Sequence, residues 1–492
     1  MNIQEAKDYI KDTVKLYLKK DEYGDYRIPV VRQRPVFLLG APGIGKTAVM
    51  SQIASELDIA LVSYSMTHHT RQSALGLPFI KEKTYEGNSY SVSEYTMSEI
   101  IASVYETMEE SGVKEGILFL DEINCVSETL YPSMLQFLQY KVFGKHTVPE
   151  GWVIVTAGNP PEFNRAVREF DVVTLDRLKV IEVEADYPAW KKYAYDRGLN
   201  GAIRGFLESN REYFYTVETT AFGKNYVTAR GWEDLSEIID LYEEADKKVT
   251  ESLIGQYIKN DTVTKEFAAY YDLYNKYKRQ YDIESVFSGT ISESAMNTAR
   301  SAATDERLAL TGMLTDAIKA EIKDCMNQSV MLKEIRASVK KMLDAATEEE
   351  VKAILSKLIL ARETIIKNKS RAGSLTADEK RSNKKIIAFY RKMEEELSVG
   401  KGVRDIFNSE VSSLKERVTA TQGRITNLFE KMAEIFGDES NEMLVMVTEL
   451  TLNSDSAAFF AEFRSDAYEK YNKLLMVGDR RENLRKEILD IL

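Results

Sequence analysis

Short apolar runs alternate with amphipathic stretches in the first part of the chain. The apolar runs predict strands at residues 36–39, 59–64, 117–120, 153–157 and 180–183. Helical spacing of apolar residues predicts helices at 3–19, 47–57, 98–110 and 127–140. Strands that alternate with helices favour a mostly parallel sheet, which holds ligands at the carboxyl ends of its strands. Alternating residues around Gly144 predict a β-hairpin within 140–151, just before the fourth strand.

The rest of the chain has a different pattern. All nine prolines lie between Pro29 and Pro188, and proline breaks helix interiors, so long helices are expected after residue 188. Capping-box spacing at Thr347 and Thr376, each followed by Glu at the third position, predicts helix starts there. Charged helices with apolar stripes favour a helical bundle, with a long dimeric coiled coil as the alternative.

These patterns predict an α/β part followed by an all-α part. The expected divisions are an α/β subdomain at residues 1–185, a helical subdomain at 186–285 and a helical accessory region at 286–492. A chain of 492 residues is long enough for two or three hydrophobic cores.

Composition narrows the functional classes. The apolar fraction of 44% and charged fraction of 29% are typical of soluble globular proteins. No apolar run approaches the roughly 20 residues that cross a bilayer, and the first residues include acids, so we expect a cytoplasmic protein without membrane insertion. The net charge of −12 makes nucleic acid an unlikely partner. Cys125 and Cys325 are far apart and have neither disulfide-framework nor zinc spacing.

A glycine-rich loop joins the first predicted strand of the sheet to a helix. Its G-x-x-x-x-G-K-T spacing is typical of a phosphate cradle, in which backbone N–H groups and the helix dipole bind phosphate oxygens. Lys46 would neutralise the outer phosphates, and the Thr47 hydroxyl would be a ligand of Mg²⁺. The expected nucleotide-binding residues are Gly40, Ala41, Pro42, Gly43, Ile44, Gly45, Lys46 and Thr47.

Polar residues end two later strands. Asp121 and Glu122 follow the run 117–120, and paired carboxylates at the end of a buried strand are costly unless they have a use. We expect Asp121 to hold Mg²⁺ through its hydration shell and Glu122 to act as the general base for the attacking water. Asn159 ends the next strand and could reach the γ-phosphate or the water, although Asn before Pro is also common in turns.

The ordered set of motifs resembles the AAA+ ATPases of the MoxR type, over about residues 20–245. The matching segments are the phosphate loop, Asp121-Glu122-Ile123-Asn124, the hairpin, Ala157-Gly158-Asn159-Pro160, Leu175-Asp176-Arg177-Leu178 and Thr228-Ala229-Arg230-Gly231-Trp232. The resemblance implies a P-loop AAA+ parallel sheet with a helical lid, ATP and Mg²⁺ as cofactors, and a homo-oligomeric ring, usually a hexamer. Leu178 and Ala229 depart from the Phe and Pro that relatives often carry.

The resemblance also assigns roles to two arginines. Arg177 would be the arginine finger that reaches the site of the neighbouring subunit, and Arg230 the second sensor on the lid. A surface ion pair is the alternative for either residue, and Arg165 or Arg168 could serve in place of Arg177.

The insertion at 66–97 and the hairpin at 141–148 would face the ring channel, by the same resemblance. We expect several side chains of these loops to be exposed. They could bind a substrate or contact another subunit, and both alternatives stay open. These candidates are Tyr85, Tyr90, Tyr140, Phe143 and Lys145.

The sequence therefore predicts an ATP-hydrolysing ring that remodels or activates a protein partner, in the manner of a chaperone. MoxR-type proteins often act with partners that carry a von Willebrand factor A domain, and the resemblance extends that expectation to this chain. The alternatives are a nucleic-acid-stimulated motor or restriction-type NTPase, and a nucleotide-gated scaffold that hydrolyses slowly. The acidic balance disfavours the motor, and Glu122 disfavours the scaffold.

Overall fold

The chain folds into two compact units. The structure is a computed structural model that describes residues 1–68, 71–164, 167–220, 223–345 and 347–473. The first unit comprises Met1–Asp186 and Ser356–Ile387, and the second comprises Tyr187–Leu355 and the residues from Ala388 on. The segment 356–387, which the sequence analysis assigned to the accessory region, is thus grouped with the first unit.

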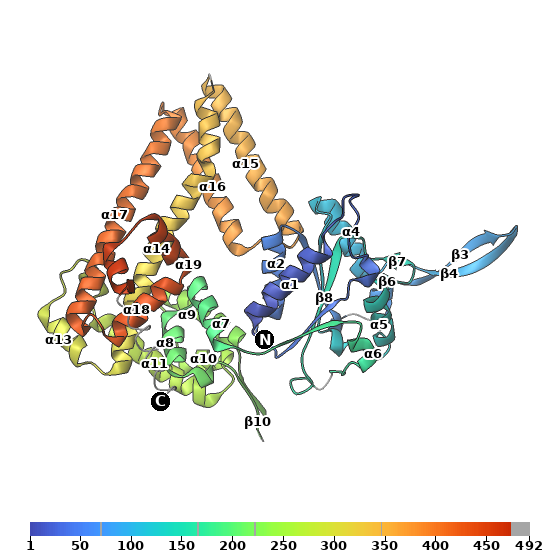
Figure 1. Cartoon of the computed structure of the whole chain (residues 1–492), viewed down its shortest axis with the longest axis horizontal. Coiled ribbons are helices and arrows are strands. Elements are labelled where there is room, and N and C mark those ends of the chain that lie inside the picture. The colour runs from blue at the N-terminus through green and yellow to red at the C-terminus, as the bar shows by residue number, and fades with distance from the viewer. Residues whose placement is uncertain (69–70, 165–166, 221–222, 346, 474–492) are drawn as a thin grey trace, which may run out of the picture. The chain divides into compact units, whose positions relative to one another are not determined.

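A five-stranded parallel sheet forms the centre of the first unit (Figure 1). Its strand order is β2-β5-β8-β1-β9, and every neighbouring pair is parallel. The expected strands are confirmed, each boundary to within one residue. They are β1 (Val36–Gly40), β2 (Ala60–Ser65), β5 (Gly116–Asp121), β8 (Trp152–Gly158) and β9 (Lys179–Val183).

Helices cover this sheet, so its central strands are buried. Every residue of β8 is buried, as continuous apolar runs predict for a parallel sheet with both faces covered. Trp152, at the start of β8, is fully buried in this core. The helices of the amino-terminal segment are α1 (Ile3–Tyr17), α2 (Lys46–Leu57), α3 (Arg71–Leu75), α4 (Glu99–Ser111), α5 (Tyr131–Tyr140) and α6 (Val172–Leu175).

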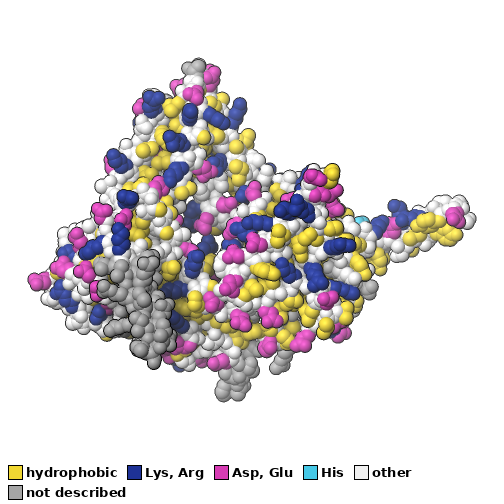
Figure 2. Space-filling view, in the orientation of Figure 1, with side chains coloured by type: hydrophobic (Ala, Val, Ile, Leu, Met, Phe, Trp, Pro, Cys, Tyr) yellow, Lys and Arg dark blue, Asp and Glu magenta, His cyan; other side chains and the backbone are white. Residues whose placement is uncertain are grey.

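Two β-hairpins extend the first unit. The expected hairpin around Gly144 is confirmed as β6 (Val142–Phe143) and β7 (His146–Thr147). A longer hairpin of β3 (Pro78–Tyr85) and β4 (Asn88–Tyr95) projects from the sheet, and was not expected as strands (Figure 1). Its turn residues, Glu86 and Gly87, have φ values of 49° and 85°, which suit a two-residue hairpin turn. Hydrophobic and charged side chains lie side by side on its surface (Figure 2).

The second unit is mostly helical. A two-stranded hairpin of β10 (Thr216–Thr220) and β11 (Gly223–Val227) lies within the expected helical subdomain and was not expected there. Four of the five residues at 216–220 are β-branched, which favours a strand. The helices are α7 (Tyr187–Arg197), α8 (Gly201–Ser209), α9 (Ala229–Glu244), α10 (Glu251–Tyr257), α11 (Asp261–Gln280), α12 (Ile283–Phe287), α13 (Glu293–Ser301), α14 (Thr304–Leu343), α17 (Val403–Phe436), α18 (Asn441–Leu452) and α19 (Ser454–Glu462).

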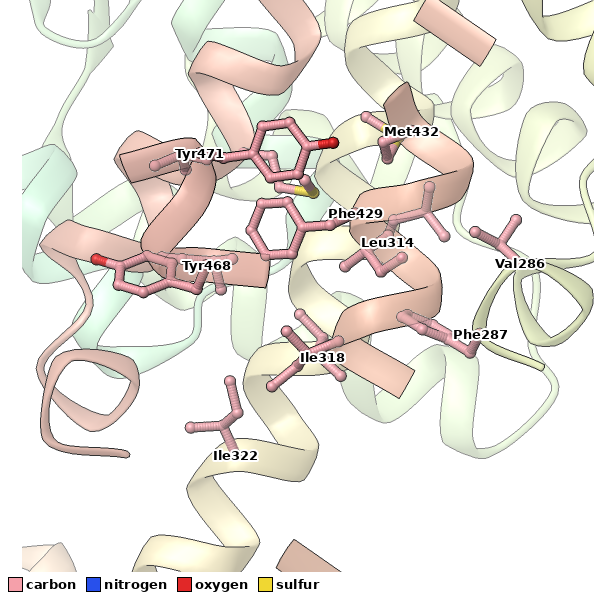
Figure 3. Packing of buried hydrophobic residues seen from close by; sticks show 14 of the residues in the cluster. Val286, Phe287, Leu314, Ile318, Ile322, Phe429, Met432, Tyr468 and Tyr471 are labelled. Carbon is pink, nitrogen blue, oxygen red and sulfur yellow. The ribbon is translucent and has the colours of Figure 1, made fainter. Parts of the chain in front are cut away.

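The core of the second unit lies between α14 and α17. Leu314 and Ile318 on α14 pack with Phe429 and Met432 on α17, and Phe287 of α12 joins them (Figure 3). Side chains of several helices thus surround one core, which is the packing of the expected helical bundle.

Helices α15 (Glu348–Arg371) and α16 (Ala377–Ser398) begin where the capping boxes predicted. At α16, the Glu379 amide donates to Thr376 Oγ1 at 3.2 Å, and the Thr376 amide donates to Glu379 Oε2 at 3.1 Å. At α15, the Glu350 amide donates to Thr347 Oγ1 at 3.2 Å. Across the described residues, we find no helix with the length and hydrophobicity needed to traverse a membrane.

Candidate functional site

The loop between β1 and α2 has the backbone shape of an anion cradle. Gly45 precedes α2 as its N-cap with a φ of 97°, and Gly43 has a φ of 73°. Residues with a Cβ rarely adopt this left-handed conformation, so these positions require glycine. The backbone N–H groups of a first helical turn have no carbonyl partner within the helix, and they carry its positive dipole end. The loop therefore fits the phosphates of a nucleotide.

The Lys46 ammonium is buried beside this loop. It donates hydrogen bonds to the carbonyl oxygens of Gly40 and Ala41, each at 2.8 Å, and to Asn159 Oδ1 at 2.9 Å. Asn159 follows the end of β8, which lies beside β1 in the sheet. The fold thus joins two of the predicted site residues that are far apart in the sequence.

Thr47 and Asp121 also meet at this edge of the sheet. Thr47 Oγ1 donates to Asp121 Oδ2 at 2.9 Å, and Asp121 Oδ1 accepts the Glu122 amide at 2.9 Å. A hydroxyl and a carboxylate are ligands that Mg²⁺ takes while it keeps several waters and phosphate oxygens. These two oxygens therefore fit a Mg²⁺ ion that arrives with a nucleotide. The described residues contain no group of three or more His, Cys, Asp or Glu that could hold a metal ion.

Two hydroxyl groups fix the carboxylate of Glu122. Its Oε2 accepts hydrogen bonds from Ser65 Oγ and Thr67 Oγ1, each at 3.0 Å. Glu122 itself has a φ of 56°, a left-handed conformation that residues other than glycine adopt rarely. Sequence reasoning missed Ser65 and Thr67, and the only available signal was their place at the end of the second strand.

Cys125 lies in the turn that follows Asp121 and Glu122. Burial, and then the carboxylates of Glu122 and Asp121, raise the pKa of Cys125. This direction disfavours the thiolate, which is the reactive form of cysteine.

The comparison with known families agrees with this geometry. Residues 36–175 match the model of the ATPase family associated with various cellular activities, AAA. This segment is an AAA ATPase domain. The matched range includes the phosphate loop, Asp121, Glu122 and Asn159, and it ends before Arg177. None of the curated proteins matched the chain.

Arg177 forms no hydrogen bond or ion pair with the site residues Lys46, Asp121 and Glu122 among the described residues. It follows α6 and is exposed. Beside it, Val172 and Val173 on α6 are 81% and 59% exposed. The Arg177 side chain and these two apolar side chains are therefore accessible on one surface segment.

The other candidate arginines differ from Arg177. Arg168 forms an ion pair with Glu128, and Arg165 lies outside the described residues. Arg230 belongs to the second unit, in the first turn of α9, where Thr228 caps the helix by accepting the Gly231 amide at 3.1 Å. Its side chain is exposed.

Ion pairs tie the two hairpins of the AAA domain together. The buried Glu94 carboxylate of β4 pairs with Lys145 at the β6–β7 turn and with Lys83 of β3. These two ammonium groups hold the pKa of Glu94 at about 2. The expectation that Phe143 is exposed was wrong, because its ring is buried and stacks on Phe137 at 4.1 Å.

The other hairpin candidates are accessible. Tyr85 and Tyr90 are 52% and 51% exposed, and their rings lie 6.1 Å apart on one face of the β3–β4 hairpin. Tyr140 and Lys145 are also exposed, although Lys145 is engaged with Glu94.

Proposed function

We propose that this protein is a MoxR-type AAA+ ATPase that hydrolyses ATP in a homo-oligomeric ring to remodel or activate a protein partner. One observation carries the proposal. Lys46, Thr47, Asp121 and Asn159 are joined by hydrogen bonds at one edge of the sheet, while the cation that would complete them, Arg177, is exposed beside apolar residues of α6. Hydrolysis would therefore need a second protomer.

Each residue of this set has a role that its position supports. ATP with Mg²⁺ supplies the phosphoryl group and a divalent charge near it. The backbone of Gly40–Thr47 binds the phosphates, and Lys46 exchanges its bonds to Gly40 and Ala41 for phosphate oxygens. Thr47 and Asp121 hold the metal ion directly or through its water.

The remaining residues act on the attacking water and on the γ-phosphate. Glu122 accepts a proton from it as general base, with its carboxylate oriented by Ser65 and Thr67, and Asn159 orients the γ-phosphate or the water. Arg177 from the neighbouring protomer stabilises the charge that develops on the phosphoryl oxygens. Arg230, on the lid, would contact the nucleotide as the second sensor.

AAA domains typically form rings, and we propose a hexamer here. In this proposal, residues 186–285 are the lid and residues 286–492 select the partner, for which a von Willebrand factor A domain protein is the candidate. The β3–β4 and β6–β7 hairpins are joined through Glu94, so they would contact this partner as one element. The protein would work in the cytoplasm.

Three variants test the proposal. Lys46→Ala should lose nucleotide affinity, and Glu122→Gln should bind ATP and retain it unhydrolysed. Arg177→Ala should bind ATP normally but fail to hydrolyse it. A mixture of Glu122→Gln and Arg177→Ala should recover activity, because a mixed interface can combine an intact Glu122 with an intact Arg177.

Two outcomes would contradict the proposal. Hydrolysis per protomer that is equally fast in dilute and concentrated protein would exclude a shared site. Stimulation by DNA or RNA, and not by a protein that is isolated with ATP-loaded Glu122→Gln, would favour a nucleic-acid motor instead.

A further inference from the structure

Asn124 lies in the turn after Asp121 and Glu122, and is only 4% exposed. Its Nδ2 donates a hydrogen bond to the backbone oxygen of Asn159 at 2.8 Å. The side chain of Asn159 in turn accepts the bond from Lys46 at 2.9 Å. A single amide therefore connects the acidic turn to the residue that contacts Lys46.

The same side chain packs against the end of β8. A Cβ built on Gly158 would lie 2.5 Å from Asn124 Oδ1, which is closer than side chains tolerate. The glycine thus allows the Asn124 amide to lie flat against the backbone that leads into Asn159. This close approach fixes the carbonyl that Asn124 bonds.

The backbone of Asn124 makes a third connection. Its carbonyl oxygen accepts the Arg168 amide at 2.9 Å, and Arg168 belongs to the segment that leads to α6 and Arg177. One buried residue therefore touches the segments that carry Glu122, Asn159 and Arg177.

We infer that Asn124 is a positioning residue for ATP hydrolysis, which sets the place of Asn159 relative to Lys46. The inference rests on the proposed function. A partly buried carbonyl that loses its donor must find another partner, so removal of the amide would let the turn at Asn159 shift. A shift of about 1 Å in a positioning group can slow a reaction by about 100-fold.

The test is a double-mutant cycle between Asn124→Ala and Asn159→Ala, read as kcat and as the Kd of a fluorescent ATP analogue. Asn124→Ala should lower kcat by at least about 10-fold and leave the Kd within about threefold, because the phosphate cradle is intact. Because Asn124 acts through Asn159, the double variant should be no slower than Asn159→Ala alone. Losses in kcat that multiply would overturn the inference.

Two further variants separate positioning from folding. Gly158→Ala should displace the Asn124 amide and reproduce the loss in kcat at unchanged Kd. Asn427→Ala is the matched control, since Asn427 Nδ2 donates to the Phe287 carbonyl at 2.7 Å in the second unit. Its kcat should equal that of the wild type, and an equal loss there would overturn the inference. If the wild type hydrolyses ATP and Asn124→Ala matches it, only the inference fails; an inactive wild type would sink the proposed function itself.

Discussion

The hydroxyl of Thr47 lies 2.9 Å from a carboxylate oxygen of Asp121, although 74 positions separate the two residues. Thr47 is in the first turn of α2, and Asp121 ends β5. Because β8 lies between β1 and β5, the two residues reach each other across the carboxyl edge of the sheet. This contact leads to a prediction about the metal ion.

Thr47→Val keeps the size of the side chain but removes the hydroxyl oxygen. We expect the Mg²⁺ concentration for half-maximal ATP hydrolysis to rise by about 10-fold, or about 1.4 kcal/mol in binding free energy, because the variant lacks one oxygen ligand of the ion. Thr47→Ser, which keeps the oxygen, should behave as the wild type. A magnesium titration of both variants measures this, and identical curves for Thr47→Val and wild type would refute the assignment.

The sequence predicted the parts of this site that are continuous in the chain. The phosphate loop and the acidic end of β5 each form a local motif, and strands buried on both faces give continuous apolar runs. Ser65 and Thr67 could not be assigned, because the order of strands decides that β2 lies beside β5. Phe143 was misjudged, because alternation shows that a residue points to one face but not which face is covered. Helical periodicity likewise did not reveal that 356–387 packs with the first unit.

Ser65 and Thr67 provide the second prediction. Ser65→Ala combined with Thr67→Val removes both hydroxyl donors to Glu122 Oε2, so the carboxylate loses its fixed orientation. We expect kcat to fall by about 10-fold, which is less than the roughly 100-fold or more that a general base contributes, because Glu122 is still present; ATP affinity should stay unchanged. Single-turnover hydrolysis measures the effect. A faster variant would instead mean that the hydroxyls restrain Glu122.

Lys141 gives the first unit a dependence on pH. Its ammonium is buried and donates to the Val30 carbonyl, and burial lowers the pKa of Lys141 from 10.5 to about 8. Between pH values of about 8 and 10.5, Lys141 has lost its proton in the folded state but keeps it in the unfolded state. The free energy of unfolding therefore rises with pH in this window. Relative to Lys141→Met, the wild type should gain about 2 kcal/mol between about pH 7 and about pH 9.5.

Urea denaturation can measure this gain for the first unit alone. Replacing Trp190 and Trp232 by Phe removes the tryptophans of the second unit, so that buried Trp152 reports on the first. Wild-type Lys141 and Lys141→Met are then compared in this background. Parallel changes in the unfolding free energy of both proteins across the window would show that Lys141 titrates normally.

The turn between α15 and α16 covers the edge of the sheet. The Leu61 amide of β2, an outer strand, donates to the Ala372 carbonyl at 2.7 Å, and Lys369 pairs with Asp58 at 3.0 Å. Gly373 has a φ of 66°, and a Cβ there would lie 2.5 Å from the Leu61 oxygen. Covering a strand edge in this way protects its amide groups from solvent and from other strands.

Gly373→Ala should therefore detach this turn from β2, and amide hydrogen exchange at Leu61 should become much faster. Gly400→Ala is the matched control, since Gly400 also has a positive φ, of 89°, but nothing lies within 4 Å of its Cβ position. Both variants carry the same backbone strain of about 1–2 kcal/mol, so only the clash with Leu61 distinguishes them. Exchange at Leu61 that is no faster in Gly373→Ala than in Gly400→Ala would show that the turn does not protect β2.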